Sequence, residues 1–360
     1  MKIDIHCHAL GNGTDLNNID NDVYFNAEDN HHWFTRILYS LVGEDLGRMR
    51  ADINRDGTIS TGEYFELLYR LVNAAQEIDG VVLLALDAVY DPETGELNEH
   101  KTDLWVSNAF LHRKVMELNE RLRNEPDPGK RGKRFFFGAS INPNRKDGEA
   151  ELDYVLTQTT AVLIKWIPSV QHISVMDEGH REFYRALAYH NMPLLCHVGP
   201  EYAFPEGIRK RGLDNIRYLT KPLEQGVTVI AAHCATSVFP PVEKNQIKEL
   251  YAMMKDVNGD ATVQLWADTS ALSLSTRIPL IPEILETFPP QWLVHGSDFP
   301  IPIDGWPHLP WVTRDMTPDE YIRIWKTKNS FDRDVRIKRA HGFSDTILAN
   351  ATNLLRLPVS

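Results

Sequence analysis

Cysteine is scarce in this chain, which has only three among its 360 residues. The three, Cys7, Cys196 and Cys234, each stand next to a histidine in the sequence. So few cysteines argue against a disulfide framework and favour a reducing compartment, so we expect a cytoplasmic protein. We expect Cys7 and Cys196 to be small buried hydrophobic residues between the strands and the helices.

Long hydrophobic runs and an excess of basic residues are also missing. No apolar run approaches the roughly 18 residues of a membrane-spanning helix, and the mean hydropathy is −0.33. The first expected strand begins at Lys2, which leaves no room for a signal peptide. Lys and Arg number 38 against 50 Asp and Glu, and the net charge of −12 argues against nucleic acid or an anionic membrane as a partner. We expect a small-molecule substrate as the partner. Whether the chain forms a homo-oligomer is left open by the sequence.

The chain does contain short apolar runs, and several of them end in a residue that can bind a metal. The runs are KIDIHCH, AVLIKW, MPLLCH, VTVIAAH and WLVHGSDFP, and the residues are His6, His8, Lys165, His197, His233 and Asp298. Successive members from Lys165 are 32, 36 and 65 positions apart, and a further run, ATVQLWADTS, lies inside the longest interval. An interval of 32 or 36 residues suits one strand plus one helix. This rhythm predicts a parallel barrel with one site at its mouth.

The expected strands follow from these runs, and near-continuous apolar character suits parallel strands that are buried on both faces. The expected strands are Lys2–His8, Val81–Asp87, Arg134–Ser140, Ala161–Trp166, Pro193–His197, Val227–Ala232, Thr262–Ala267 and Trp292–His295. Two of the expected helices span Thr61–Ile78 and Leu104–Arg123. We interpret residues 1–360 as one barrel, with an insertion and first helix over residues 9–79.

His6 and His8 are two positions apart on one strand, so both should point to the same face, and Cys7 to the other. Two imidazoles that converge from one strand make half of a divalent metal site. His197 adds a third nitrogen and Asp298 supplies an oxygen.

The motifs HCH, IKW, CHVG, AAHC and HGSDFP resemble those of the amidohydrolase superfamily, in particular its amidohydrolase-2 branch of metal-dependent hydrolases and decarboxylases. The C-terminal FDRDVRIKRAHGF looks like the tail of this branch. The resemblance implies an α/β fold, a (β/α)8 TIM barrel. It also implies a metal on four residues, His6, His8, His197 and Asp298, with His233 as a second ligand or a substrate contact.

Lys165 leaves the number of metals open. A lysine at this strand end can react with CO₂ to form a carbamate that bridges two metals. In relatives with this pattern, His6, His8 and Asp298 would hold the first metal, and His197 and His233 the second. The alternative is an ammonium that neutralises a carboxylate, and we favour one metal. Zn²⁺ and Mn²⁺ both suit a His/Asp site.

The insertion carries a second motif, DINRDGTISTGE, which matches the calcium loop of an EF-hand with Gly57 at its turn position. The expected calcium ligands are Asp52, Asn54, Asp56, Thr58, Ser60 and Glu63. EF-hands usually work in pairs, and no second loop is visible, so the alternative is a surface turn that binds nothing. A bound Ca²⁺ would be structural rather than regulatory.

A metal-bound water with a pKa of about 7 would supply hydroxide at neutral pH. Asp298 would take the proton of this water, and His233 would polarise a carbonyl oxygen. This set predicts a hydrolase of a small amide, lactone or ester. The alternatives are a non-oxidative decarboxylase of a small aromatic or unsaturated acid and a calcium-binding structural protein. Trp166, Arg209 and Arg211 are candidate substrate contacts.

Overall fold

The computed structural model describes residues 1–26, 46–47, 49–55, 58–127, 132–239, 243–259, 263–301 and 316–357. Its main sheet has eight strands, and neighbouring strands pair in parallel in the order β1-β3-β5-β6-β7-β8-β9-β10. The strands are β1 (Ile3–His8), β3 (Gly80–Leu84), β5 (Arg134–Ala139), β6 (Ala161–Trp166), β7 (Leu194–Cys196), β8 (Val229–Ala231), β9 (Leu265–Asp268) and β10 (Leu293–Val294).

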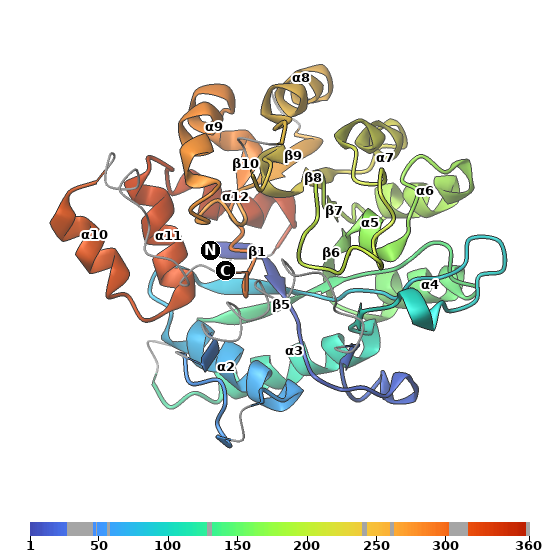
Figure 1. Ribbon diagram of the computed structural model, residues 1–360, viewed down its shortest axis with the longest axis horizontal. Helices are drawn as coiled ribbons and strands as arrows, with labels where there is room; N and C mark the ends of the chain where they lie inside the picture. Colours follow the sequence, from blue (N-terminus) through green and yellow to red (C-terminus); the bar gives the residue numbers. More distant parts are fainter. Residues whose placement is uncertain are drawn as a thin grey trace.

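Backbone hydrogen bonds close this sheet into a barrel. The Ile5 N–H donates to the His295 carbonyl at 3.0 Å, and the His8 N–H donates to the Phe299 carbonyl at 2.8 Å. The segment that follows β10 therefore lies against β1, and the expected (β/α)8 barrel is confirmed. Figure 1 shows the helices arranged around the strands, with the N-terminal end near the middle of the view.

The helices alternate with the strands along the chain. They are α2 (Thr61–Ala74), α3 (Asn108–Arg123), α4 (Gly148–Gln158), α5 (Pro168–Gln171), α6 (Arg181–Tyr189), α7 (Thr220–Glu224), α8 (Ile247–Val257), α9 (Ile281–Thr287), α10 (Pro318–Trp325), α11 (Ser330–Ala340) and α12 (Thr346–Leu354). Short 3-10 turns span Leu16–Asn18, Glu99–Lys101, Glu178–His180, Ile216–Leu219, Ala232–Ala235, Ile278–Leu280 and Pro290–Trp292. None of the helices in the described part of the chain is long and apolar enough to cross a membrane.

The structure corrects the helix that was expected from Leu104. Leu104–Trp105 instead forms strand β4, which pairs in an antiparallel manner with β2 (Tyr24–Phe25) from the insertion. The helix begins at Asn108, where the side chain of Ser107 accepts a hydrogen bond from the Phe110 N–H. The expected strand from Thr262 begins at Leu265, and Thr262 itself lies outside the described residues.

Strand β1 contains a register shift around His6. Between Asp4 and Cys7 the pairing advances three residues on β1 but only two on β3, from Val81 to Leu83. Such a bulge lets neighbouring residues on one strand face the same side. Cys7 belongs to the apolar layer under the helices, as does Cys196, which confirms the expectation for both cysteines.

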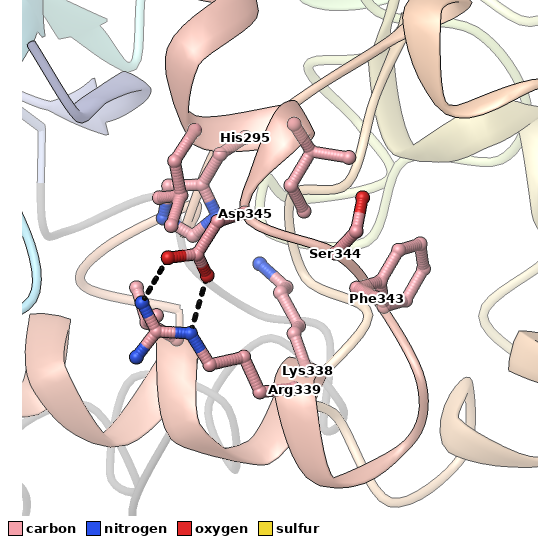
Figure 2. Close-up of a pocket in the computed structure, with 9 residues that line it drawn as sticks. His295, Lys338, Arg339, Phe343, Ser344 and Asp345 are labelled. Atoms are coloured by element: carbon pink, nitrogen blue, oxygen red, sulfur yellow. Dashed lines mark hydrogen bonds and ion pairs between the residues drawn. The ribbon is translucent and has the colours of Figure 1, made fainter.

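A buried ion pair attaches α11 to the barrel. The Lys338 ammonium donates to Asp334 Oδ2 and to the Gly296 carbonyl, both at 2.6 Å, and Asp334 also accepts from Ser273 Oγ. Figure 2 shows the small pocket beside this pair, lined by α11, α12 and His295, where Arg339 holds Asp345 through two hydrogen bonds of 2.6 and 2.9 Å. The pocket contains none of the expected ligands.

Lys338→Met leaves the Asp334 charge buried and unpaired. We expect a loss of about 3–5 kcal/mol in the free energy of unfolding, measured by urea denaturation. Lys248→Met, at an exposed lysine, is the control and should change it by less than about 0.5 kcal/mol. Equal stability of the two variants would contradict the role of the pair.

Candidate metal centre

The expected ligands converge at the carboxyl ends of the strands. His6 and His8 come from β1, and Asp298 comes from the segment after β10. Asp298 Oδ1 lies 3.3 Å from His6 Nε2 and 3.1 Å from His8 Nε2. The three residues form a group whose ligand atoms all lie within 4.8 Å of one another, so the group could hold a metal ion.

These spacings suit a metal. Nitrogen and oxygen ligands at about 2.0–2.2 Å from a tetrahedral ion are about 3.3–3.6 Å from each other, and somewhat less in an octahedral site. The separations of 3.1 and 3.3 Å from Asp298 Oδ1 are therefore close to those of atoms that share one ion. The His6 side chain is fully buried, whereas that of His8 is 18% exposed, so His8 stands on the open side.

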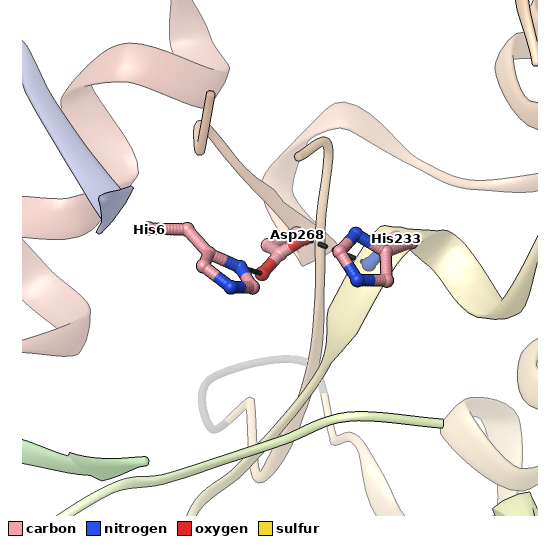
Figure 3. A group of neighbouring side chains, drawn as sticks. All are labelled: His6, His233 and Asp268. Carbon is pink, nitrogen blue, oxygen red and sulfur yellow. Dashed lines mark hydrogen bonds and ion pairs between the residues drawn. The ribbon is translucent and has the colours of Figure 1, made fainter. Parts of the chain in front are cut away.

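Asp268 at the end of β9 holds His6 in place, and Figure 3 shows the two side chains with His233. Asp268 Oδ2 lies 2.7 Å from His6 Nδ1 and fixes the ring with the proton on that nitrogen. Nε2 is then left without a proton, and it lies 3.0 Å from Lys165 Nζ and 3.3 Å from Asp298 Oδ1. Burial would raise the pKa of Asp268, but the contact with His6 holds it below its usual range.

Electrostatics keep His6 in the form that binds metal. Burial, followed by the neighbouring Lys165, lowers the pKa of His6 to about 4, so its imidazole is neutral at pH 7. Burial would raise the pKa of Asp298, but the three histidines His6, His233 and His8 hold it well below its usual range. A neutral His6 and an ionised Asp298 are the protonation states of these two residues that a divalent metal requires.

His233 lies in a strained turn directly after β8. His233, Cys234 and Ala235 have φ values of 57°, 51° and 53°, and such left-handed backbone costs a non-glycine residue about 1–3 kcal/mol. Asp268 supports the turn, because its Oδ1 accepts the His233 N–H at 2.8 Å. His6, His233 and Asp268 form the second group that could hold a metal.

His197 follows β7 and lies against His233, with ring centroids 5.2 Å apart. Its Nδ1 faces Glu201 Oε2 at 3.5 Å. Its Nε2 is buried and has no hydrogen-bond partner among the described residues. Such an orphaned nitrogen costs free energy unless a ligand binds it, so the residues present fit a metal at this end of the barrel. His197 lies outside both ligand groups that include His6.

Lys165 on β6 is buried, and its Nζ lies 3.0 Å from His6 Nε2. Burial lowers the pKa of this ammonium from its ordinary value. Lys165 and a metal would both use the same His6 nitrogen, so a bound metal requires Nζ to give up this contact. The carbamate form stays a prediction.

Of the expected substrate contacts, Trp166 does not face the site. It is fully buried beneath the helices, where it stacks on Phe183 and donates from Nε1 to the Ile141 carbonyl at 2.7 Å. Strand alternation explains this correction, because Lys165 faces the lumen and its neighbour must face outward. Arg209 donates to the Glu201 carbonyl, and Arg211, with a side chain 85% exposed, pairs with Glu206.

Part of the expected calcium loop can be described, although Asp56 and Gly57 lie outside the described residues. Glu63 accepts backbone hydrogen bonds from Ile53 and Asn54, both at 2.8 Å, and forms a capping box with Ser60 at the start of α2. The hydrogen bonds from Ser60, followed by the one from Asn54, lower the pKa of Glu63 to about 2. Its carboxylate therefore already faces the loop backbone.

A parallel barrel with histidines and carboxylates at the carboxyl ends of its strands defines the class of metal-dependent barrel enzymes. The family model described as amidohydrolase matches residues 3–326, so this chain belongs to that family and is an enzyme of the amidohydrolase superfamily. No curated protein matches the chain.

Several solved structures are similar to this chain. An uncharacterized TIM-barrel protein from Bordetella bronchiseptica is 16% identical, with a TM-score of 0.50 over 93% of this chain and 98% of that one. The Metarhizium anisopliae IDCase is 13% identical, with a TM-score of 0.47 over 99% and 97% of the chains. A 2,6-dihydroxybenzoate decarboxylase from Rhizobium is 11% identical, with a TM-score of 0.45 over 99% and 98%.

Asp268→Asn removes the charge that holds the His6 proton on Nδ1. We expect the affinity for Zn²⁺, measured by competition with a chelating dye, to fall about 10- to 100-fold. Asp256→Asn, at an exposed position on α8, should bind Zn²⁺ like the unmodified protein. Unchanged affinity in a folded Asp268→Asn protein would show that this contact does not support a metal ligand.

Proposed function

We propose that this protein is a metal-dependent hydrolase that acts on a small amide, lactone or ester. One observation carries the proposal. Asp268 holds His6 Nδ1, and the Nε2 atoms of His6 and His8 lie 3.3 and 3.1 Å from Asp298 Oδ1 at the mouth of the barrel. His197, with its orphaned Nε2, stands at the same end of the barrel.

In this proposal His6, His8, His197 and Asp298 hold one Zn²⁺ or Mn²⁺, which when bound acidifies a water molecule. The buried, ionised Asp298 accepts the proton of that water and passes it on towards the leaving group. Its Oδ2 lies 4.0 Å from His233 Nδ1, so the two residues face the same space.

The hydrogen bonds of His233 define which of its nitrogens can act. The single Ser270 hydroxyl proton goes to Asp268, so His233 Nδ1 must donate to Ser270 Oγ at 2.8 Å or to the Ser270 carbonyl at 3.2 Å. Burial, followed by the charge of Arg277, lowers the pKa of His233 well below its ordinary value. We therefore assign neutral His233 an acceptor role through Nε2, in place of donation to a carbonyl. With Nε2 as the acceptor, His233 can take up a proton, or it can bind a second metal together with Lys165.

Asp298→Asn keeps an oxygen ligand but removes the proton acceptor. We expect at least a 100-fold loss of turnover with little change in the melting temperature or in the bound metal, measured by steady-state kinetics and metal analysis. Asp319→Asn, at an exposed position on α10, is the matched control. Activity within tenfold of the unmodified enzyme would remove Asp298 from proton transfer.

The buried ammonium of Lys165 favours decarboxylation as the second candidate, because a cation beside the metal ligands could hold a substrate carboxylate there. Hydrolysis consumes water and releases an acid, whereas decarboxylation replaces a carboxylate by hydrogen and releases CO₂. A screen of lactones, amides and aromatic acids separates the two reactions. Acid release without CO₂ supports the hydrolase, and CO₂ release from an aromatic or unsaturated acid supports the decarboxylase.

We also retain a structural Ca²⁺ on the loop of residues 52–63, with the side chain of Glu63 as a ligand. The orientation of the Glu63 carboxylate supports this assignment. Its oxygens accept hydrogen bonds from backbone N–H groups of the loop, so the carboxylate points into the loop. The second alternative, a purely structural calcium-binding protein, would have no use for the ligand groups around His6 that this chain has.

Calcium should raise the melting temperature, because the unfolded loop cannot form the same cage of oxygens. We expect Glu63→Gln to abolish this shift and to leave turnover nearly unchanged, whereas Glu93→Gln, at an exposed position, should retain it. The measurement is a thermal melt with excess Ca²⁺ and with a chelator. A melting temperature that does not depend on calcium would show that Glu63 serves only as the helix cap.

A further inference from the structure

Arg277 is a buried arginine with almost no hydrogen-bond partners. It lies in the loop between β9 and α9 and is only 3% exposed. Its Nε donates to the Ser237 carbonyl at a long 3.4 Å, and its guanidinium has no other hydrogen bond or ion pair among the described residues. A guanidinium has five N–H donors, so most of its hydrogen-bonding capacity is unused.

The position of Arg277 places these donors at the same end of the barrel as the metal centre. Arg277 follows Asp268 by nine positions on the loop after β9, and Ser237 follows His233 by four positions on the loop after β8. The two loops that carry Asp268 and His233 thus also carry the contact between Arg277 and Ser237. Burial lowers the pKa of Arg277, whereas the charges of Asp298 and Glu201 raise it, in keeping with a location near Asp298.

Ser237 adds a second unused group. It is 1% exposed, and its Oγ is buried with no hydrogen-bond partner among the described residues. A buried hydroxyl carries a free-energy cost when it lacks a partner. Ser237 and the Arg277 guanidinium are thus neighbouring donors with unused capacity, which indicates a site for a ligand that accepts hydrogen bonds and carries negative charge.

We propose that Arg277 binds a carboxylate group of the substrate, with Ser237 Oγ as an additional donor, away from the bond that reacts at the metal. The planar fork of arginine matches a carboxylate through two parallel hydrogen bonds. This inference rests on the proposed function only in taking the substrate to react at the metal centre. It deepens that function by defining the substrate class as a small molecule with an anionic group remote from its reacting bond.

A purely electrostatic role is the competing explanation, in which Arg277 only balances the carboxylates of Asp298 and Glu201. The two roles differ in what a ligand would do. A binding site discriminates a carboxylate from its neutral amide and depends on the guanidinium, whereas charge balance affects the protein with or without a ligand. Direct binding measurements therefore separate the roles without any need for turnover.

The test is calorimetric titration of the full-length, chelator-treated protein with glutarate, benzoate and the corresponding amides. We expect at least one carboxylate to bind at least tenfold more tightly than its amide. Arg277→Met should weaken this binding about 10- to 100-fold, and Arg277→Lys should weaken it less. Arg185→Met, at an exposed arginine on α6 that pairs with Glu182, is the control and should change it less than threefold.

Thermal melts establish that each variant is folded, and Ser237→Ala provides a second variant should Arg277→Met fail to fold. Ser237→Ala should weaken carboxylate binding by a few-fold. The proposal is overturned by equal affinity for carboxylates and amides, by no binding of either, or by folded Arg277 and Ser237 variants that bind like the unmodified protein. The titration uses metal-free protein, so its result does not depend on the proposed hydrolase function. That function is tested separately, and it fails if the protein does not bind Zn²⁺ or does not turn over substrate.

Discussion

The hydrogen bond between His6 Nδ1 and Asp268 Oδ2 is the contact on which the rest of the site depends. It joins the first strand of the barrel to the seventh, and it selects the histidine nitrogen that remains available for a metal. The same carboxylate accepts the His233 N–H and the Ser270 hydroxyl, so it also supports the strained turn after β8. One buried charge thereby positions a proposed ligand and a proposed proton acceptor. Its burial is tolerated because every one of these contacts is a hydrogen bond to the charged form.

Barrel closure brings the remaining parts to this contact. Asp4 Oδ1 accepts the backbone N–H groups of His6 and Ser297, at 3.0 and 2.9 Å, and so attaches β1 to the segment that carries Asp298. Gly296 allows this close approach, because a Cβ atom at that position would lie 2.7 Å from the Cβ of His6. The ion pair between Lys338 and Asp334 then holds the Gly296 carbonyl from outside the barrel. The metal centre is thus built from contacts that also close the fold.

The barrel and most of its strand ends could be predicted, because apolar runs that end in polar residues recur at the length of one strand plus one helix. The run Ala161–Trp166 matches β6 at both ends. Asp268 was missed although it stands 35 positions after His233, an interval close to the 32 and 36 positions between the preceding strand ends. Arg277 was missed because its role depends on the absence of partners, which only the folded structure reveals. Trp166 was placed wrongly because the alternation that turns Lys165 inward was not applied to its neighbour.

The most direct test is a crystal structure of the protein grown with Zn²⁺, with anomalous scattering measured on both sides of the zinc absorption edge. The two ligand groups share His6 but combine it with different residues, so the position of the ion distinguishes them. We expect the anomalous peak next to His6 Nε2, His8 and Asp298, with Asp268 still bound to His6 Nδ1. A peak between His6 Nδ1, His233 and Asp268, or no peak among these residues, would contradict the proposed metal centre.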